Sequence, residues 1–242
     1  MLIRILFMIM FISIQAQSQQ WANFSTKNFL IHYEKNIPQS SLQYINDELT
    51  KVYKSYEKTF GRANRRVEIF VCATVSVFKS KSSSRIFEDG DVVDGIIYLV
   101  APKTVEQKTN FHSKVSKRII ACAILEQFPG IPKWLAESYS LYAGGYLDDF
   151  GEPARFNISS FYDLNEDYNH ATSKKDVKEL YAKLAATAKF LINRYGDLKV
   201  ERMLRSFDGR KAFDEVFETS FNEKISDIER AWVKALQNQE LR

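Results

Sequence analysis

The spacing of apolar residues changes along the chain. Short runs rich in aromatic and β-branched residues predict strands at 29–33, 67–73 and 95–101. Apolar positions that recur every three or four residues predict an amphipathic helix over 40–60, which Gly61 ends. The polar, serine-rich segment 79–84 predicts a loop.

Helical spacing dominates the second half of the chain. Two helices are predicted on either side of Pro132, at about 110–128 and 133–143. Four more are predicted further on, at 177–195, 200–207, 211–218 and 224–237. Residues 146–173 are polar and rich in Asn and Asp, and they predict a loop or partial lid. This order predicts an α+β fold, with a mixed domain over 19–145 and a helical lobe over 146–242.

The N-terminus has the pattern of an export signal. A basic end at 1–4 precedes an apolar run at 5–14, and small residues follow at 16–18. We expect cleavage after residue 18, and a periplasmic or extracellular protein; an uncleaved membrane anchor is the alternative. The run is short for a permanent membrane span, and no other segment is apolar enough for one.

Composition and charge exclude two classes of protein. A chain with 45% apolar and 14% aromatic residues can build a core, so it is not disordered. The formal charge of +4 is spread along the chain, and the absence of a basic stripe with interleaved aromatics argues against nucleic acid as a partner. Cys72 and Cys122 lie in apolar runs and are predicted to be buried thiols, although export would permit a disulfide.

The most informative motif follows the helix at 110–128. The segment 131–137 reads Ile-Pro-Lys-Trp-Leu-Ala-Glu and resembles the third-ligand segment of the peptidase MA-like (gluzincin) family, secreted bacterial zinc peptidases. Weaker similarities cover most of the chain, at 28–33, around Cys72 and Tyr98, at 181–196 and at 228–232. The resemblance implies a zincin-like fold in which Glu137 stands at the third metal-ligand position.

The rest of that family's zinc site is replaced. Catalytic zinc needs three protein ligands, an open position for water and a general base, which His-Glu-x-x-His on the preceding helix would supply in part. The corresponding residues are Arg118 and Cys122 in place of the histidines and Ile119 in place of the base. We therefore predict a vestigial site without metal, in which only Glu137 keeps its type and Ser138 replaces the usual glycine.

The sequence offers two other sources of metal ligands. Among the three histidines, only His170 provides a ligand set, together with Cys122 and Glu137, and it would make the protein a metallohydrolase with an unusual zinc site. The acidic segment 89–95 lacks EF-hand spacing and predicts a turn before a strand rather than a calcium loop.

The substitution of a permanent cation for a ligand suggests what replaces the metal. We expect Arg118 to form a buried ion pair with Glu137. The alternative is that Arg118 lies at the rim of the helix and contacts solvent.

These observations predict a pseudopeptidase that serves as a binding or scaffolding module of the cell envelope. Its expected cleft is lined by Ile97, Tyr98 and Trp134 and holds an extended peptide by strand addition. A third interpretation is an envelope protein whose partner binds elsewhere, on the C-terminal helices.

Overall fold

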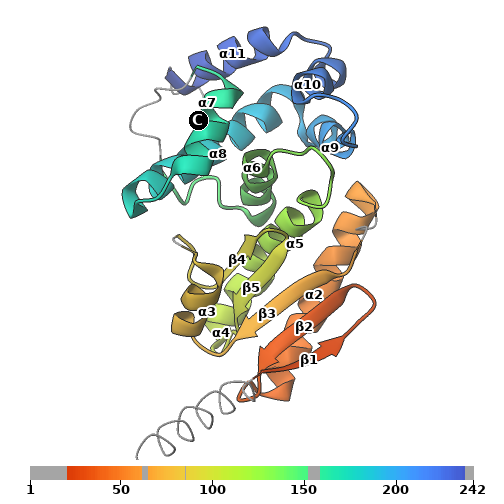
Figure 1. Cartoon of the computed structure of the whole chain (residues 1–242), viewed down its shortest axis with the longest axis vertical. Helices are drawn as coiled ribbons and strands as arrows, with labels where there is room; N and C mark the ends of the chain where they lie inside the picture. Colours follow the sequence, from red (N-terminus) through yellow and green to blue (C-terminus); the bar gives the residue numbers. More distant parts are fainter. Residues whose placement is uncertain (1–20, 62–64, 85, 152–158, 238–242) are drawn as a thin grey trace, which may run out of the picture.

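The computed structural model describes residues 21–61, 65–84, 86–151 and 159–237 (Figure 1). The predicted signal segment lies outside these residues. Within them, none of the helices is long and apolar enough to cross a membrane.

The first part of the chain forms a mixed sheet of five strands in the order β1-β2-β3-β5-β4. These are β1 (Trp21–Ser25), β2 (Phe29–Glu34), β3 (Val67–Cys72), β4 (Gly90–Val93) and β5 (Ile96–Val100). The strands β2, β3 and β5 are parallel, while β1 and β4 run antiparallel at the two edges. The helix α2 (Gln39–Phe60) connects β2 to β3 and buries one apolar face, as its spacing predicted.

The helices of the second half begin beside the sheet and end in a separate helical layer (Figure 1). They are α4 (Val105–Asn110), α5 (Ser116–Leu125), α6 (Lys133–Gly144), α7 (Phe161–His170), α8 (Lys174–Tyr195), α9 (Asp197–Arg205), α10 (Phe213–Phe221) and α11 (Ile225–Gln237). The helix α6 packs against both α5 and α8 and so joins the two layers. One continuous core of buried apolar side chains extends from the sheet to α11. The α+β class is confirmed, and the proposed division near residue 145 stays a prediction.

A π-helical turn, η1 (Phe111–Val115), lies between α4 and α5 and leads directly into the predicted site helix. An inserted π turn rotates the following residues about the helix axis relative to a regular α-helix. The helical segment begins earlier than residue 110, at Val105, where the Thr104 side chain caps it and the Gln107 side chain completes a capping box.

Two predictions about segments were wrong, and a third was right only in part. The expected loop at 79–84 overlaps α3 (Val75–Ser82), where Thr74 caps the first turn and Phe78 is fully buried. Part of the expected loop at 146–173 is α7, which begins with a capping box from Ser160 and Asp163. The turn expected within 89–95 does form, at Asp94-Gly95 before β5, but the residues before it form β4, an edge strand that pairs with β5 through this hairpin. The strand β1 was not predicted.

Candidate functional site

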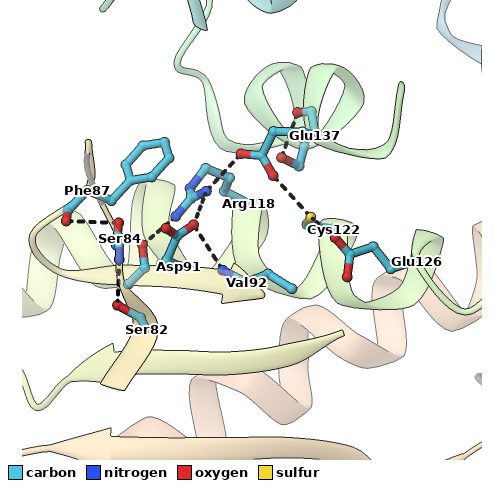
Figure 2. A network of polar contacts seen from close by, with 11 residues as sticks. Ser82, Ser84, Phe87, Asp91, Val92, Arg118, Cys122, Glu126 and Glu137 are labelled. Carbon is cyan, nitrogen blue, oxygen red and sulfur yellow. Dashed lines mark hydrogen bonds and ion pairs between the residues drawn. The ribbon is translucent and has the colours of Figure 1, made fainter. Parts of the chain in front are cut away.

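Arg118 on α5 is completely buried and connects three elements (Figure 2). Its Nη1 lies 3.1 Å from Oε1 of Glu137 on α6 and 3.5 Å from Oδ1 of Asp91 on β4. Its Nη2 donates a hydrogen bond to the backbone carbonyl of Gly90. The predicted Arg118–Glu137 ion pair is confirmed, and the alternative of a solvent-exposed arginine is wrong.

The guanidinium also lies over the ring of Phe87 and near that of Tyr146. Its central carbon lies 3.4 Å from the centroid of the Phe87 ring and 5.8 Å from that of Tyr146. A planar cation over a ring face gains electrostatic attraction that is larger when both groups are desolvated. At the base of the side chain, a Cβ placed on Gly144 would lie 2.8 Å from the Cβ of Arg118, so this approach requires glycine.

Cys122 lies one turn further along α5 and faces the same carboxylate. Its Sγ is 3.2 Å from Oε2 of Glu137 and 3.7 Å from Oε1 of Glu126. Burial raises the pKa of the Cys122 thiol well above its usual value, and the nearby carboxylates add to the effect. The protonated thiol therefore serves as a donor and is a poor nucleophile. Both Cys72 and Cys122 are free and buried, as predicted.

Glu137 is thus held at both oxygens, by a guanidinium on one side and a thiol on the other (Figure 2). Burial raises the pKa of this carboxyl, and the positive charge of Arg118 opposes that rise. Residues 118 and 122, four apart on α5, both reach position 137 on α6. This is the mutual arrangement that the resemblance to gluzincins implied for the two missing histidines and the third ligand.

The other predicted site residues lie elsewhere. Ile119 is fully buried and faces β4, where its Cγ2 lies 3.6 Å from the position a Cβ on Gly90 would take. Ile97 and Trp134 are 0% and 1% exposed, which leaves them no surface toward a cleft. Tyr98 is half-buried and stacks on Phe70, on the face of the sheet opposite the buried Ile97. Ile97, Tyr98 and Trp134 therefore do not line an open cleft.

A groove of about 300 Å³ does lie next to the site. One wall is formed by β4 and the serines that end α3, and the other by Tyr168 of α7 with Leu180 and Tyr181 of α8. Glu126 and Lys133 close it where α5 ends and α6 begins. Sequence reasoning missed this groove because its second wall includes α7, which lies within the segment predicted to be a loop.

The outer edge of β4 faces this side of the sheet and is already hydrogen-bonded. The N–H of Val100 donates to the carbonyl of Asp89, and hydrogen-bonded pairs alternate along an antiparallel ladder. The backbone groups of Gly90 and Val92 therefore point away from β5, toward the free edge of β4. The Gly90 carbonyl accepts from Arg118, and the Val92 N–H donates to the carboxylate of Asp91 at 2.9 Å. Side chains of the protein itself therefore occupy part of this strand edge.

The histidines do not contribute to the site. His32 lies 3.0 Å from Glu68 on the sheet, His112 contacts Glu48, and His170 contacts Glu166 within α7. Across the described parts of the chain, no three His, Cys, Asp or Glu side chains are grouped so that they could hold a metal ion. The alternative ligand set that included His170 is therefore not assembled in this conformation.

The chain matches no protein-family model, and comparison with curated proteins finds no match either. The resemblance to gluzincins accordingly rests on the motif at 131–137 and on the weaker similarities along the chain.

Proposed function

We propose that the protein is an exported, gluzincin-like pseudopeptidase that serves as a binding or scaffolding module of the cell envelope. The buried Arg118–Glu137 ion pair is the observation that supports this proposal most directly. In a gluzincin site, the carboxylate of the third ligand faces the two positions that correspond to 118 and 122 here. In this protein, position 118 carries a cation, Arg118, which pairs with that carboxylate.

The chemistry of these side chains argues against zinc in this frame. Arginine remains protonated in proteins, so Arg118 offers a metal neither a lone pair nor a neutral form. Its charge, 3.1 Å from Glu137, repels a divalent cation from the same oxygen. Ile119 cannot accept a proton from water, so the position of the general base is chemically inert.

The groove between β4 and α7–α8 is the best-supported place for a ligand. Strand addition along β5 is excluded because β5 lies between β3 and β4 and has no free edge. Addition to β4 would have to displace hydrogen bonds made by Arg118 and Asp91. We therefore place an extended peptide, or a segment of an envelope protein, across the groove, with its side chains rather than its backbone providing most of the recognition.

Restoring the missing motif tests the frame. The triple variant Arg118→His, Ile119→Glu, Cys122→His is expected to bind one zinc per chain, measured by metal analysis after dialysis, because Glu137 is already in reach of positions 118 and 122. The same variant with Glu137→Gln is the matched control and should bind zinc far more weakly. The unaltered protein should contain substoichiometric zinc and leave a quenched casein substrate intact.

Two results would contradict the proposal. Stoichiometric zinc in the unaltered protein, lost on Cys122→Ala, would establish the metallohydrolase alternative. A folded triple variant that binds no zinc would show that α5 and α6 do not form a gluzincin frame.

A further inference from the structure

The groove carries an unbalanced charge. Among the residues that the structure describes, its lining includes the carboxylates of Asp91, Asp94 and Glu126 and one cation, Lys133. The Lys133 ammonium lies 2.5 Å from Asp94, and Asp91 lies 3.5 Å from Arg118. Within the part of the chain that the structure describes, no Lys, Arg or His nitrogen lies within 4 Å of the Glu126 carboxylate, so this charge has no cation in direct contact.

The surroundings of Glu126 make this absence significant. The Sγ of Cys122 lies 3.7 Å from its Oε1, but the single thiol hydrogen is closer to Glu137 at 3.2 Å, and Glu137 itself repels Glu126. Lys133 attracts it, and the backbone N–H of Gly95 stabilises its charge. The guanidinium of Arg65 lies on the same side of the hairpin turn: a Cβ on Gly95 would be 3.5 Å from Nη2 of Arg65 and 3.8 Å from Oε2 of Glu126. The net result is that burial and Glu137 raise the pKa of Glu126 to about 7.

The walls suit an alkyl chain that ends in a charge. Leu180 and Val177 of α8 and Ile86 beyond α3 supply apolar surface, and Tyr168 and Tyr181 supply aromatic rings. Burial raises the pKa of both tyrosines, and repulsion by Glu137 adds to the rise, so both rings lie in a field that disfavours negative charge. A volume of about 300 Å³ accommodates one long side chain or one chain terminus.

We propose that this groove binds a cationic group of the ligand, a primary amine or a guanidinium, with the Glu126 carboxylate as its counter-ion. This inference rests on the proposed function and names the ligand class of the same groove: a peptide that presents a Lys or Arg side chain, or a free amino terminus. The alkyl portion lies between Leu180 and the tyrosines, and an anionic ligand is rejected by the carboxylates.

The pH dependence follows from the ionisation of Glu126. Only its ionised form pairs with a cation, and with a pKa of about 7 that form rises from roughly 10% at pH 6 to roughly 90% at pH 8. Among the described residues, the other titratable groups that line the groove are Asp91, Asp94 and Lys133, each in contact with a partner, and Tyr168 and Tyr181, whose raised pKa values keep them protonated in this pH range. Affinity for a cation should therefore increase nearly tenfold between pH 6 and pH 8, and a bound cation should lower the pKa of Glu126 in turn.

Small probes test the charge directly. We would titrate n-butylamine, n-butylguanidinium and neutral butanamide into the protein and follow the Glu126 carboxyl and the amides of β4 by NMR. The two cations should shift these signals in the millimolar range, more strongly at pH 8, and butanamide should not. Glu126→Gln should abolish the response, while Glu88→Gln, at an exposed carboxylate paired with Lys79, is the matched control.

Three short peptides separate the sources of the cation. One has a free amino terminus and no lysine, one is acetylated with a single lysine, and one is acetylated without lysine. Tighter binding of the first identifies the α-amino group, and tighter binding of the second identifies the side chain. Binding of either cationic peptide should weaken at least tenfold on Glu126→Gln, down to the affinity of the acetylated neutral peptide.

The outcomes separate this inference from the proposed function. If all three peptides bind equally well at the groove, the binding function stands and the role of Glu126 is refuted. If the amines bind but no peptide does, the cation site stands and the peptide ligand is refuted. Equal binding of butanamide and n-butylamine, or unchanged affinity between pH 6 and pH 8 in the unaltered protein, overturns the inference without reliance on any variant.

Discussion

Replacing Arg118 by methionine is the most direct test of the buried ion pair. Methionine retains much of the side-chain volume against Phe87 but removes the charge and the hydrogen-bond donors. Arg118 is 0% exposed, and the side chains of Glu137 and Asp91 are 3% and 11% exposed, so the carboxylates left behind cannot be well hydrated in the native structure. Removal of one partner of such a pair costs about 3–5 kcal/mol, because an unpaired charge remains buried.

The cost should depend on pH and on Glu137. Burial already raises the pKa of Glu137, and loss of Arg118 raises it further because the opposing charge is gone. A carboxyl with a raised native pKa contributes stability at low pH that is lost as the pH rises through that pKa, so the variant should be less destabilised at pH 5 than at pH 8. In the double variant with Glu137→Gln, about 1.5–3 kcal/mol should be recovered.

The assay is urea unfolding at both pH values, followed by the fluorescence of the buried Trp134 and Trp232. Lys79→Met, which removes an exposed ion pair with Glu88, is the control and should cost less than about 1 kcal/mol. The reasoning is refuted if Arg118→Met costs no more than this control, or if its cost is the same at pH 5 and pH 8.

Four further outcomes are expected. Gly144→Ala should destabilise the protein by about 1–3 kcal/mol in urea unfolding, because the new methyl group would lie 2.8 Å from the Cβ of the buried Arg118 and overlap it. Cys122 should react with iodoacetamide no faster than the protein unfolds, as measured by mass spectrometry, because its buried thiol has a raised pKa. Asp91→Ala should release the Val92 N–H and promote concentration-dependent association in analytical ultracentrifugation. The unaltered protein should lose stability on the order of 3 kcal/mol in urea unfolding as the pH rises from about 4.5 to about 7, because the native pKa of Glu126 is raised, and Glu126→Gln should remove this loss.

Elements with strong internal periodicity were predictable, while elements fixed by caps or by pairing were not. The helix α2 has apolar residues at helical spacing, and the strands β2, β3 and β5 are short, mostly apolar runs. All four elements form as predicted. The serines and lysines of α3 obscured a helix whose start is set by Thr74. At β4 the decisive signal was the Asp94-Gly95 pair, which is typical of a two-residue hairpin and has positive φ at both positions.

The contacts within the site that depend on local sequence were predictable, and those that depend on distant segments were not. The facing of Arg118, Cys122 and Glu137 followed from helical spacing and from the motif at 131–137. The participation of Asp91 did not, because it depends on β4, an edge strand that was not predicted, and on a contact with Arg118, which lies 27 residues further along the chain. The groove could not be predicted for the same reason, since its walls come from α3, β4, α7 and α8.

Stability alone does not explain why the protein has a buried ion pair between Arg118 and Glu137. A buried pair replaced by well-packed apolar residues is often neutral or more stable, so Arg118 and Glu137 are not required for a firm core. Loss of either partner alone is costly, however, which makes the pair difficult to dismantle one residue at a time. What the pair adds is geometry: the guanidinium joins α5 to the Gly90 carbonyl on β4 and to α6 at once. Because β4 is one wall of the groove and α6 begins with Lys133, the charge of Arg118 also fixes the shape of the proposed binding site.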